Sequence, residues 1–425
     1  MNTKPARAWN RLDNAAKIFP PTTSRRDPKV FRFSCRLTEE VDPEILQKAL
    51  DATIHNFPVF RCILKNGAFW YYLEESAQRP LVLEETAPPC STMFKYSRKL
   101  LFQTLYFRQR ISLEVYHALT DGTGAMQFFK ELVCRYLSLR HPEAAGDADF
   151  SFSDYDASFA QRENDSFDHY YDKKNKQRNP GDPPAFQLRG VKNPEGVMTI
   201  LEGVAPSREL LRAAKEKGVT ATVLLASILL RNIAGEMRVA DRKKPVILNI
   251  PVNLRNYFDS QSARNFFSLI PTGMAFPHGP RPIGEILPVV KEQFAQRLTL
   301  EYLQNRLDDL EDLEHNPMSR IVPLPLKDLA IRAAYRISER SSTAALSNMG
   351  VVTLPETLLP YIEYFDVMTS TPKLQLCVCS CGGVTSMCFS SAFRSPDVPR
   401  RFFRTLADLG VPITVITNRG EEEQP

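Results

Sequence analysis

The sequence has no long run of apolar residues. Its longest strongly apolar stretch, Thr220 to Leu230, stops at Arg231 and falls well short of the ~20 residues that span a bilayer. The first residues are basic, but no apolar segment with a small-residue cleavage site follows them, which argues against a secretory signal. We therefore expect a cytoplasmic protein with no membrane span.

Neither sign of charge is in large excess. The net charge is only +5 over 425 residues, which is too weak and too diffuse for a protein that tracks the phosphates of a nucleic acid. Hydrophobic residues make up 43% and charged residues 24%, which excludes disorder, collagen and coiled coil for the bulk of the chain. At ~150 residues per domain the length predicts two or three domains. No nucleic-acid partner is expected.

Several common catalytic motifs are missing. The sequence contains no G-x-S-x-G elbow, no Walker loop, no G-x-G-x-x-G and no H-E-x-x-H. Hydrolase, nucleoside-triphosphate and nicotinamide-dependent functions therefore lose their main support. Histidine is scarce as well, with 6 in the chain, and only His117 ends an apolar strand pattern.

The 8 cysteines are the residues from which a metal site would be built. Cys377, Cys379 and Cys381 form a C-x-C-x-C run, and Cys388 follows seven residues later. The short loops typical of zinc sites are missing, however, and residues two apart on a strand point to the same face. We therefore expect a row of small buried side chains and neither a metal nor disulfides.

Strand and helix patterns alternate along the chain in two stretches. The region His141 to Glu195 is polar and rich in proline, and it predicts a long, partly irregular crossover between two halves. Because both halves mix strands and helices, the class is α/β or α+β with open mixed sheets. The main expected elements are strands at 30–37, 59–64, 68–73, 101–107, 111–117, 198–204, 246–252, 374–379 and 384–389, and helices from 43, 125, 207, 220 and 287.

The segment with the most chemistry is Tyr116 to Gly124, which contains H-x-x-x-D-G. His117 continues an apolar row at the end of a strand, and a helical period begins just after the glycines. Its Nε2 could accept a proton from a hydroxyl or thiol at neutral pH, as a general base does. Asp121 is placed to cap the helix or to pair with an arginine. The alternative is a hydrogen-bonded core histidine and a plain N-cap, because short motifs also occur by chance.

The H-x-x-x-D-G motif resembles the signature of the chloramphenicol-acetyltransferase-like acyltransferases, which include alcohol O-acetyltransferases, plant-type acyltransferases and nonribosomal condensation domains. Further segments resemble bacterial alcohol acetyltransferases in the expected order, from about residue 9 to residue 390. They are Arg11 to Pro20, the Phe-Trp-Tyr-Tyr-Leu stretch from Phe69, Pro-Val-Asn-Leu-Arg from Pro251, Arg-Asn-Phe-Phe from Arg264 and Leu-Ser-Asn-Met-Gly from Leu346.

This resemblance implies two acetyltransferase-like halves, residues 1–195 and 196–425, which form a pseudo-dimer with a tunnel between them. His117 would deprotonate the acceptor for direct attack on the acyl group, with activity falling below pH ~6.5. Asp121, followed by Gly122, would be structural and pair with Arg255, and Ser347 would donate to the oxyanion. Acetyl-CoA or another acyl-CoA would be a co-substrate, a small hydroxylated molecule would be the acceptor, and the chain would be a monomer without a permanent cofactor.

The sequence departs from the family in two places. Tyr116 stands where many relatives have a second histidine, and the DFGWG motif of condensation domains and plant enzymes is missing. The missing DFGWG argues against a carrier-protein condensation role. Two alternatives nevertheless stay open beside the O-acetyltransferase. One is a carrier-protein-dependent, condensation-like enzyme, and the other is a non-catalytic binding protein of the same fold.

Overall fold

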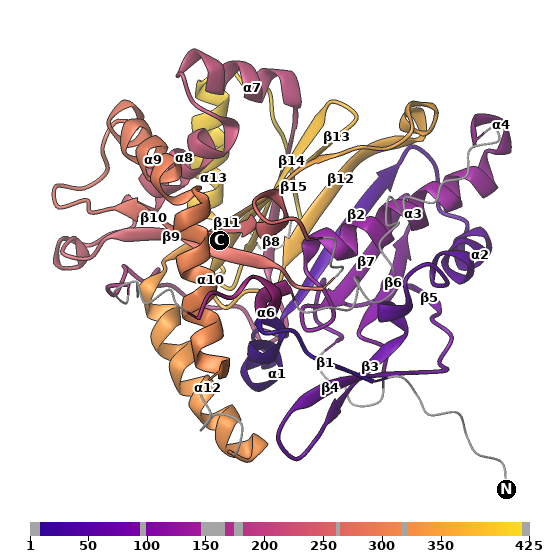
Figure 1. Cartoon of the computed structure of the whole chain (residues 1–425). Helices are drawn as coiled ribbons and strands as arrows, with labels where there is room; N and C mark the ends of the chain where they lie inside the picture. The colour runs from indigo at the N-terminus through magenta and orange to yellow at the C-terminus, as the bar shows by residue number, and fades with distance from the viewer. Residues whose placement is uncertain are drawn as a thin grey trace, which may run out of the picture.

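The computed structural model describes residues 9–93, 99–145, 166–173, 182–260, 264–315 and 322–418. A five-stranded sheet takes four strands from the first half of the chain and β12 from the second, in the order β12-β2-β7-β6-β5 (Figure 1). All neighbours are antiparallel except β5 and β6. The strands are β2 (Val30–Leu37), β5 (Val82–Glu84), β6 (Phe102–Phe107), β7 (Arg110–Tyr116) and β12 (Ile362–Thr369).

Two helices cover this sheet, namely α2 (Pro43–Thr53) and α3 (Gly122–Arg140), which also pack on each other. Asp42 caps α2 by accepting hydrogen bonds from the N–H groups of Glu44 and Ile45, and proline follows it at the first helical position. The helical stripe predicted after residue 125 is the buried face of α3. Both helices therefore form where the capping residue and the apolar stripe predict them.

A seven-stranded sheet carries the second half, in the order β10-β9-β11-β13-β14-β8-β15. Strand β11 is parallel to β9 and β13, and the other pairs are antiparallel. The strands are β8 (Thr199–Pro206), β9 (Val246–Asn253), β10 (Phe267–Met274), β11 (Ala344–Val352), β13 (Leu374–Cys381), β14 (Val384–Ser391) and β15 (Thr414–Thr417). Its main helices are α7 (Ser207–Glu216), α8 (Ala221–Ala234), α9 (Ile283–Arg297) and α13 (Asp397–Asp408).

The remaining elements are short or lie at the edges of the two halves. A three-stranded sheet joins β1 (Trp9–Arg11), β4 (Tyr71–Glu75) and β3 (Cys62–Asn66). The other helices are α1 (Phe19–Thr22), α4 (Pro142–Ala145), α6 (Ser166–Tyr170), α10 (Leu300–His315) and α12 (Leu324–Ser338). Single 3-10 turns occupy Ala15–Ile18, Pro58–Arg61, Val239–Asp241, Leu254–Asn256, Glu339–Ser341 and Glu356–Tyr361.

Strand β12 links the two halves. It comes after residue 195, where the sequence predicts the second half to begin, yet it pairs with β2 at the edge of the five-stranded sheet. It also packs against β13 and β14. The hydrophobic core accordingly has two clusters, one under each large sheet, and the first takes side chains from both sides of the predicted boundary. The division 1–195 and 196–425 remains a prediction, with β12 as an exchanged strand.

Three predicted elements differ from the structure. The strand expected from Val59 begins only at Cys62, after a 3-10 turn over Pro58–Arg61. The hairpin at Asn66 is not a two-residue turn, because Gly67 donates its N–H to the Trp70 carbonyl at 2.8 Å and the second strand starts only at Tyr71. The helix expected from 287 to 302 is two helices, because the chain leaves helical geometry at Leu298 and Thr299 caps the start of α10. Much of the predicted crossover, 146–165 and 174–181, lies outside the described residues.

All 8 cysteines are buried and are present as thiols. Cys377, Cys379 and Cys381 belong to the first core cluster, while Val378 between them belongs to the second. Burial raises the pKa of Cys377 to about 12 and that of Cys381 to about 11, so both thiols are protonated at neutral pH. The C-x-C-x-C run is therefore one face of a strand. Among the described residues, no group of three or more His, Cys, Asp or Glu could hold a metal ion.

Within the same described ranges, no single helix is long and apolar enough to cross a membrane. Only the bent pair of α7 and α8 meets the requirement, by length and composition alone.

Candidate active site

The ring of His117 lies directly after β7, at the junction with α3. Its backbone N–H donates to the Lys29 carbonyl at 2.9 Å, which fixes the strand end against the start of β2. The imidazole stacks on Phe19 with ring centroids 4.4 Å apart and meets the edge of Phe31 at 5.0 Å. The side chain is half-buried within this aromatic cage. The cage orients the ring and shields part of it from water.

The second half of the chain sets the tautomer of His117. Nδ1 lies 3.1 Å from Asn265 Oδ1, and the Asn265 amide nitrogen donates to Asp13 Oδ2 at 3.2 Å. Asp13 also accepts from the backbone N–H groups of Ala16 and Asn265, so the amide turns its N–H side to this acceptor and its carbonyl to the histidine. A carbonyl oxygen only accepts, so Nδ1 carries the proton and Nε2 keeps its lone pair. The arrangement Asp13–Asn265–His117 therefore leaves Nε2 as an unprotonated nitrogen that could accept a proton.

Burial lowers the pKa of His117 below its usual 6.5, while the nearby Asp121 carboxylate acts in the opposite direction. A lowered pKa keeps the imidazole neutral at physiological pH, which a general base requires.

The buried carboxylate of Asp121 makes both contacts predicted for it, with the start of the helix and with an arginine. Oδ1 accepts from the N–H groups of Thr123 and Gly124, both at 3.1 Å, and so caps α3. Oδ2 accepts from Arg255 Nη1 at 2.8 Å and from the Phe266 N–H at 2.9 Å. The carboxylate thus ties the helix that follows the motif to two segments of the second half.

Arg255 lies in the 3-10 turn after β9 and is nearly buried, like Asp121. Nη1 also donates to Asn253 Oδ1 at 3.1 Å, and Nη2 donates to the Arg264 carbonyl. The ion pair expected from the sequence is therefore present, and it joins the two halves. Because both charges are buried, each depends on the other for its stabilisation.

Gly122 packs closely against the end of the Met349 side chain. Neither Gly122 nor Gly124 has a positive φ, so the turn itself does not demand glycine. A Cβ at Gly122 would come within 2.9 Å of the Met349 methyl group, which belongs to β11. The motif therefore contacts the segment that follows Ser347.

Ser347 lies in β11 opposite Cys377 and is half-buried. The pairing of β11 with β13 becomes irregular between Asn348 and Val351, just after it. The structure thus brings the Ser-Asn-Met-Gly segment to the motif, while the oxyanion role of Ser347 stays a prediction.

Tyr116, which replaces the second histidine of many relatives, is fully buried. Its hydroxyl lies 2.9 Å from Thr23 Oγ1. It therefore packs as a structural residue beside the site.

Sequence reasoning gave no role to Asp13, Phe19 or Asn265, which hold the His117 ring. The first two lie in the segment from Arg11 to Pro20 and the third in Arg-Asn-Phe-Phe, both of which carried the family resemblance. The available signal was therefore the segments themselves, although their contact across 148 residues of chain is visible only in the structure.

Comparison with solved structures shows that the two-lobed fold of this chain is shared by an O-acetyltransferase and by condensation domains. The chain is similar to the TRI3 trichothecene 15-O-acetyltransferase from Fusarium sporotrichioides, with a TM-score of 0.62, 11% identity and 96% of each chain covered. It is also similar to the first condensation domain of the calcium-dependent antibiotic synthetase, with a TM-score of 0.60 and 17% identity over 95% of this chain and 97% of that one.

A third similar structure is the starter condensation domain of rhizomide synthetase in complex with C8-CoA, with a TM-score of 0.57, 14% identity and 95% of each chain covered. No protein-family model and no curated protein sequence matches the chain. At these identities the structural matches define the fold, and the chemistry has to be argued from the site.

Proposed function

We propose that the protein is an acyl-CoA-dependent O-acyltransferase that transfers an acetyl or other acyl group to a small hydroxylated acceptor. The observation that carries the proposal is the geometry of His117, whose Nδ1 is held by Asn265 so that Nε2 is left as a proton acceptor. Similar structures include an O-acetyltransferase and a domain in complex with C8-CoA, which supports acyl-CoA as co-substrate.

The proposed reaction needs no acyl-enzyme. Nε2 of His117 removes the hydroxyl proton of the acceptor as its oxygen attacks the thioester carbonyl. The tetrahedral oxyanion then collapses, the carbon–sulfur bond breaks, and the leaving thiolate takes the proton from the imidazolium. Ser347 is the proposed donor to the oxyanion, and Asp121 with Arg255 holds the strand–helix junction in place.

A carrier-protein-dependent, condensation-like reaction is the second candidate. The similarity to condensation domains over almost the whole chain favours it. It would use the same base, with the thioester on a carrier protein. The two candidates differ in the donor and share the chemistry at His117.

Thiol release distinguishes the donors. Purified protein would be incubated with acetyl-CoA, longer acyl-CoAs or an acylated carrier protein, each with a panel of alcohols and amines. We expect acceptor-dependent release of the CoA thiol. Release from the carrier protein alone would favour the second candidate, and no release with any donor would favour a non-catalytic binding protein.

Catalytic activity should fall only at a pH below 6.5, where the imidazole of His117 takes up a proton and can no longer act as the base. Because burial lowers the pKa of His117, kcat/KM should be constant above that pH and fall only as the pH drops through the lowered value. A pH–rate profile in buffers of constant ionic strength would test this. A half-maximal rate at a pH clearly above 6.5 would contradict the assignment of a desolvated imidazole as the base.

Asn265→Ala should lower kcat by about 10²-fold, because the His117 ring loses the group that fixes its orientation and tautomer. The same variant should shift the pH profile, which a purely structural residue would not do, and Asn265→Ser should restore part of the rate. Steady-state kinetics with the best acceptor would measure both. An unchanged pH profile together with normal kcat would show that Asn265 does not position the base.

A further inference from the structure

Helix α12 exposes an apolar face. Leu326, Leu329 and Ile337 are 59%, 65% and 71% exposed, and Ala330 and Ala333 between them are also exposed. The spacing from Leu326 is i, i+3, i+4, i+7 and i+11, which is one stripe of an α-helix. Large apolar side chains gathered on one exposed stripe indicate a surface that another phase or molecule covers.

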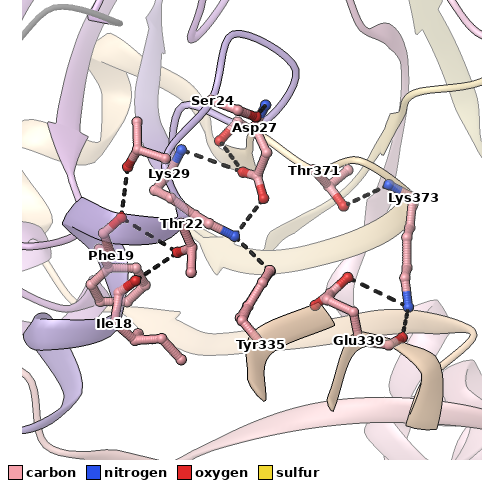
Figure 2. A network of polar contacts seen from close by, with 12 residues as sticks. Ile18, Phe19, Thr22, Ser24, Asp27, Lys29, Tyr335, Glu339, Thr371 and Lys373 are labelled. Carbon is pink, nitrogen blue, oxygen red and sulfur yellow. Dashed lines mark hydrogen bonds and ion pairs between the residues drawn. The ribbon is translucent and has the colours of Figure 1, made fainter. Parts of the chain in front are cut away.

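The opposite face of α12 is anchored to the protein. Lys29 donates to the Tyr335 hydroxyl at 2.6 Å, and the same ammonium pairs with Asp27 (Figure 2). Tyr71 donates to Asp328 at 2.6 Å, and Arg332 Nε donates to the Pro21 carbonyl at 2.7 Å. The helix is therefore held by its polar inner side, and the apolar stripe is left facing outward.

The charges beside the stripe are cationic. Arg336 and Arg340 are exposed and lie on one flank of the helix or just beyond its end, whereas Arg332 is held by the Pro21 carbonyl. The acidic residues are engaged on the inner side, Asp328 with Tyr71 and Glu339 with Lys373 (Figure 2). An apolar stripe bordered by arginines is the pattern of a helix that lies in the interface of an anionic bilayer.

A second copy of the chain fits this face less well. Helix α12 has 15 residues, whereas a stable protein interface takes ~20–30 residues a side. Two such helices would also bring their arginine rows together, without exposed acids on α12 to offset the repulsion.

We propose that α12 docks the protein on the surface of an anionic phospholipid bilayer. Leu326, Leu329 and Ile337 would insert below the headgroups, and the arginines would contact the lipid phosphates. Helix α12 itself lies close to the candidate site, because its inner side packs on α1 and Phe19 of α1 stacks on His117. This inference concerns location and does not depend on the proposed reaction.

Vesicle co-sedimentation tests the proposal with the full chain. We expect the protein to pellet with vesicles of equal parts phosphatidylcholine and phosphatidylglycerol and to pellet much less with phosphatidylcholine alone. Leu329→Glu/Ile337→Glu should reduce binding at least tenfold, and Arg336→Gln/Arg340→Gln should reduce it about fivefold for each arginine removed. Leu211→Glu is the matched control, since Leu211 is 58% exposed on α7 and should bind like wild type.

Thermal melting would verify that each variant is folded. If the glutamate variant does not fold, the arginine variant still tests the proposal. Equal pelleting of wild type and both α12 variants would overturn the proposal, as would an absence of pelleting with anionic vesicles. Ultracentrifugation without lipid provides the remaining arm. A wild-type dimer that becomes monomeric in Leu329→Glu would assign the face to a second copy instead. None of these measurements requires turnover.

Discussion

His117→Ala is expected to reduce kcat for acyl transfer by ~10²–10⁴-fold while leaving the melting temperature close to that of wild type. The rate falls because the acceptor hydroxyl loses the group that takes its proton. The fold should persist because the imidazole is half-buried and hydrogen-bonds to Asn265, which Asp13 also holds. Initial rates of thiol release, measured beside thermal melting, would check both expectations.

His141→Ala is the matched control for this substitution. His141 lies beyond the end of α3, where it stacks on Tyr361 and pairs with Glu39, outside the candidate site. The His141→Ala variant should therefore keep its turnover. If the two histidine variants lost activity equally, the loss could not be assigned to the base, and normal turnover in His117→Ala would remove His117 from the mechanism.

Asp121→Asn is expected to destabilise the protein by about 3 kcal/mol and to lower its activity as well. The substitution leaves the buried Arg255 guanidinium without its counter-charge, although the amide can still cap α3 in part. The urea denaturation midpoint would measure the loss of stability. Arg255→Gln in the same background should recover part of it, because the unpaired charge is then gone.

Glu363→Gln is the matched control, because it removes the negative charge from an exposed ion pair. Arg36 donates to Glu363 at 2.7 Å, but both side chains are about 40% exposed, so this ion pair should be worth only ~0–1 kcal/mol. A wild-type midpoint together with normal turnover in Asp121→Asn would contradict the structural role that we assign to the buried pair.

Local pattern was enough to place the motif. An apolar row ending at His117, a capping aspartate and a change of period predict the strand–helix junction, and the structure has it there. The same reasoning wrongly predicts one helix where the structure has α9 and α10. The apolar stripe continues across Thr299 and does not indicate a break in the backbone. The resemblance supplied Arg255, whose distance from Asp121 along the chain hides the pair from any local pattern.

The contacts that complete the site join distant segments. Asp13 and Asn265 meet across 252 residues, and Asn265 reaches His117 across 148. The exchange of β12 into the first sheet is also decided by tertiary packing, because a buried strand has the same hydrophobic pattern whichever sheet it joins. Single-sequence patterns report which face is buried, and the partner of that face is decided by packing of the whole chain.

Product analysis is the decisive test of whether this chain transfers an acyl group at His117. Wild-type protein and His117→Ala would each be given acetyl-CoA with the panel of alcohols, and ester and free thiol would be counted by mass spectrometry. We predict one ester for each thiol released by wild type, no acetylated protein, and almost no ester from His117→Ala. Equal ester formation by both proteins, or no ester from either with any thioester donor, would contradict the proposed reaction.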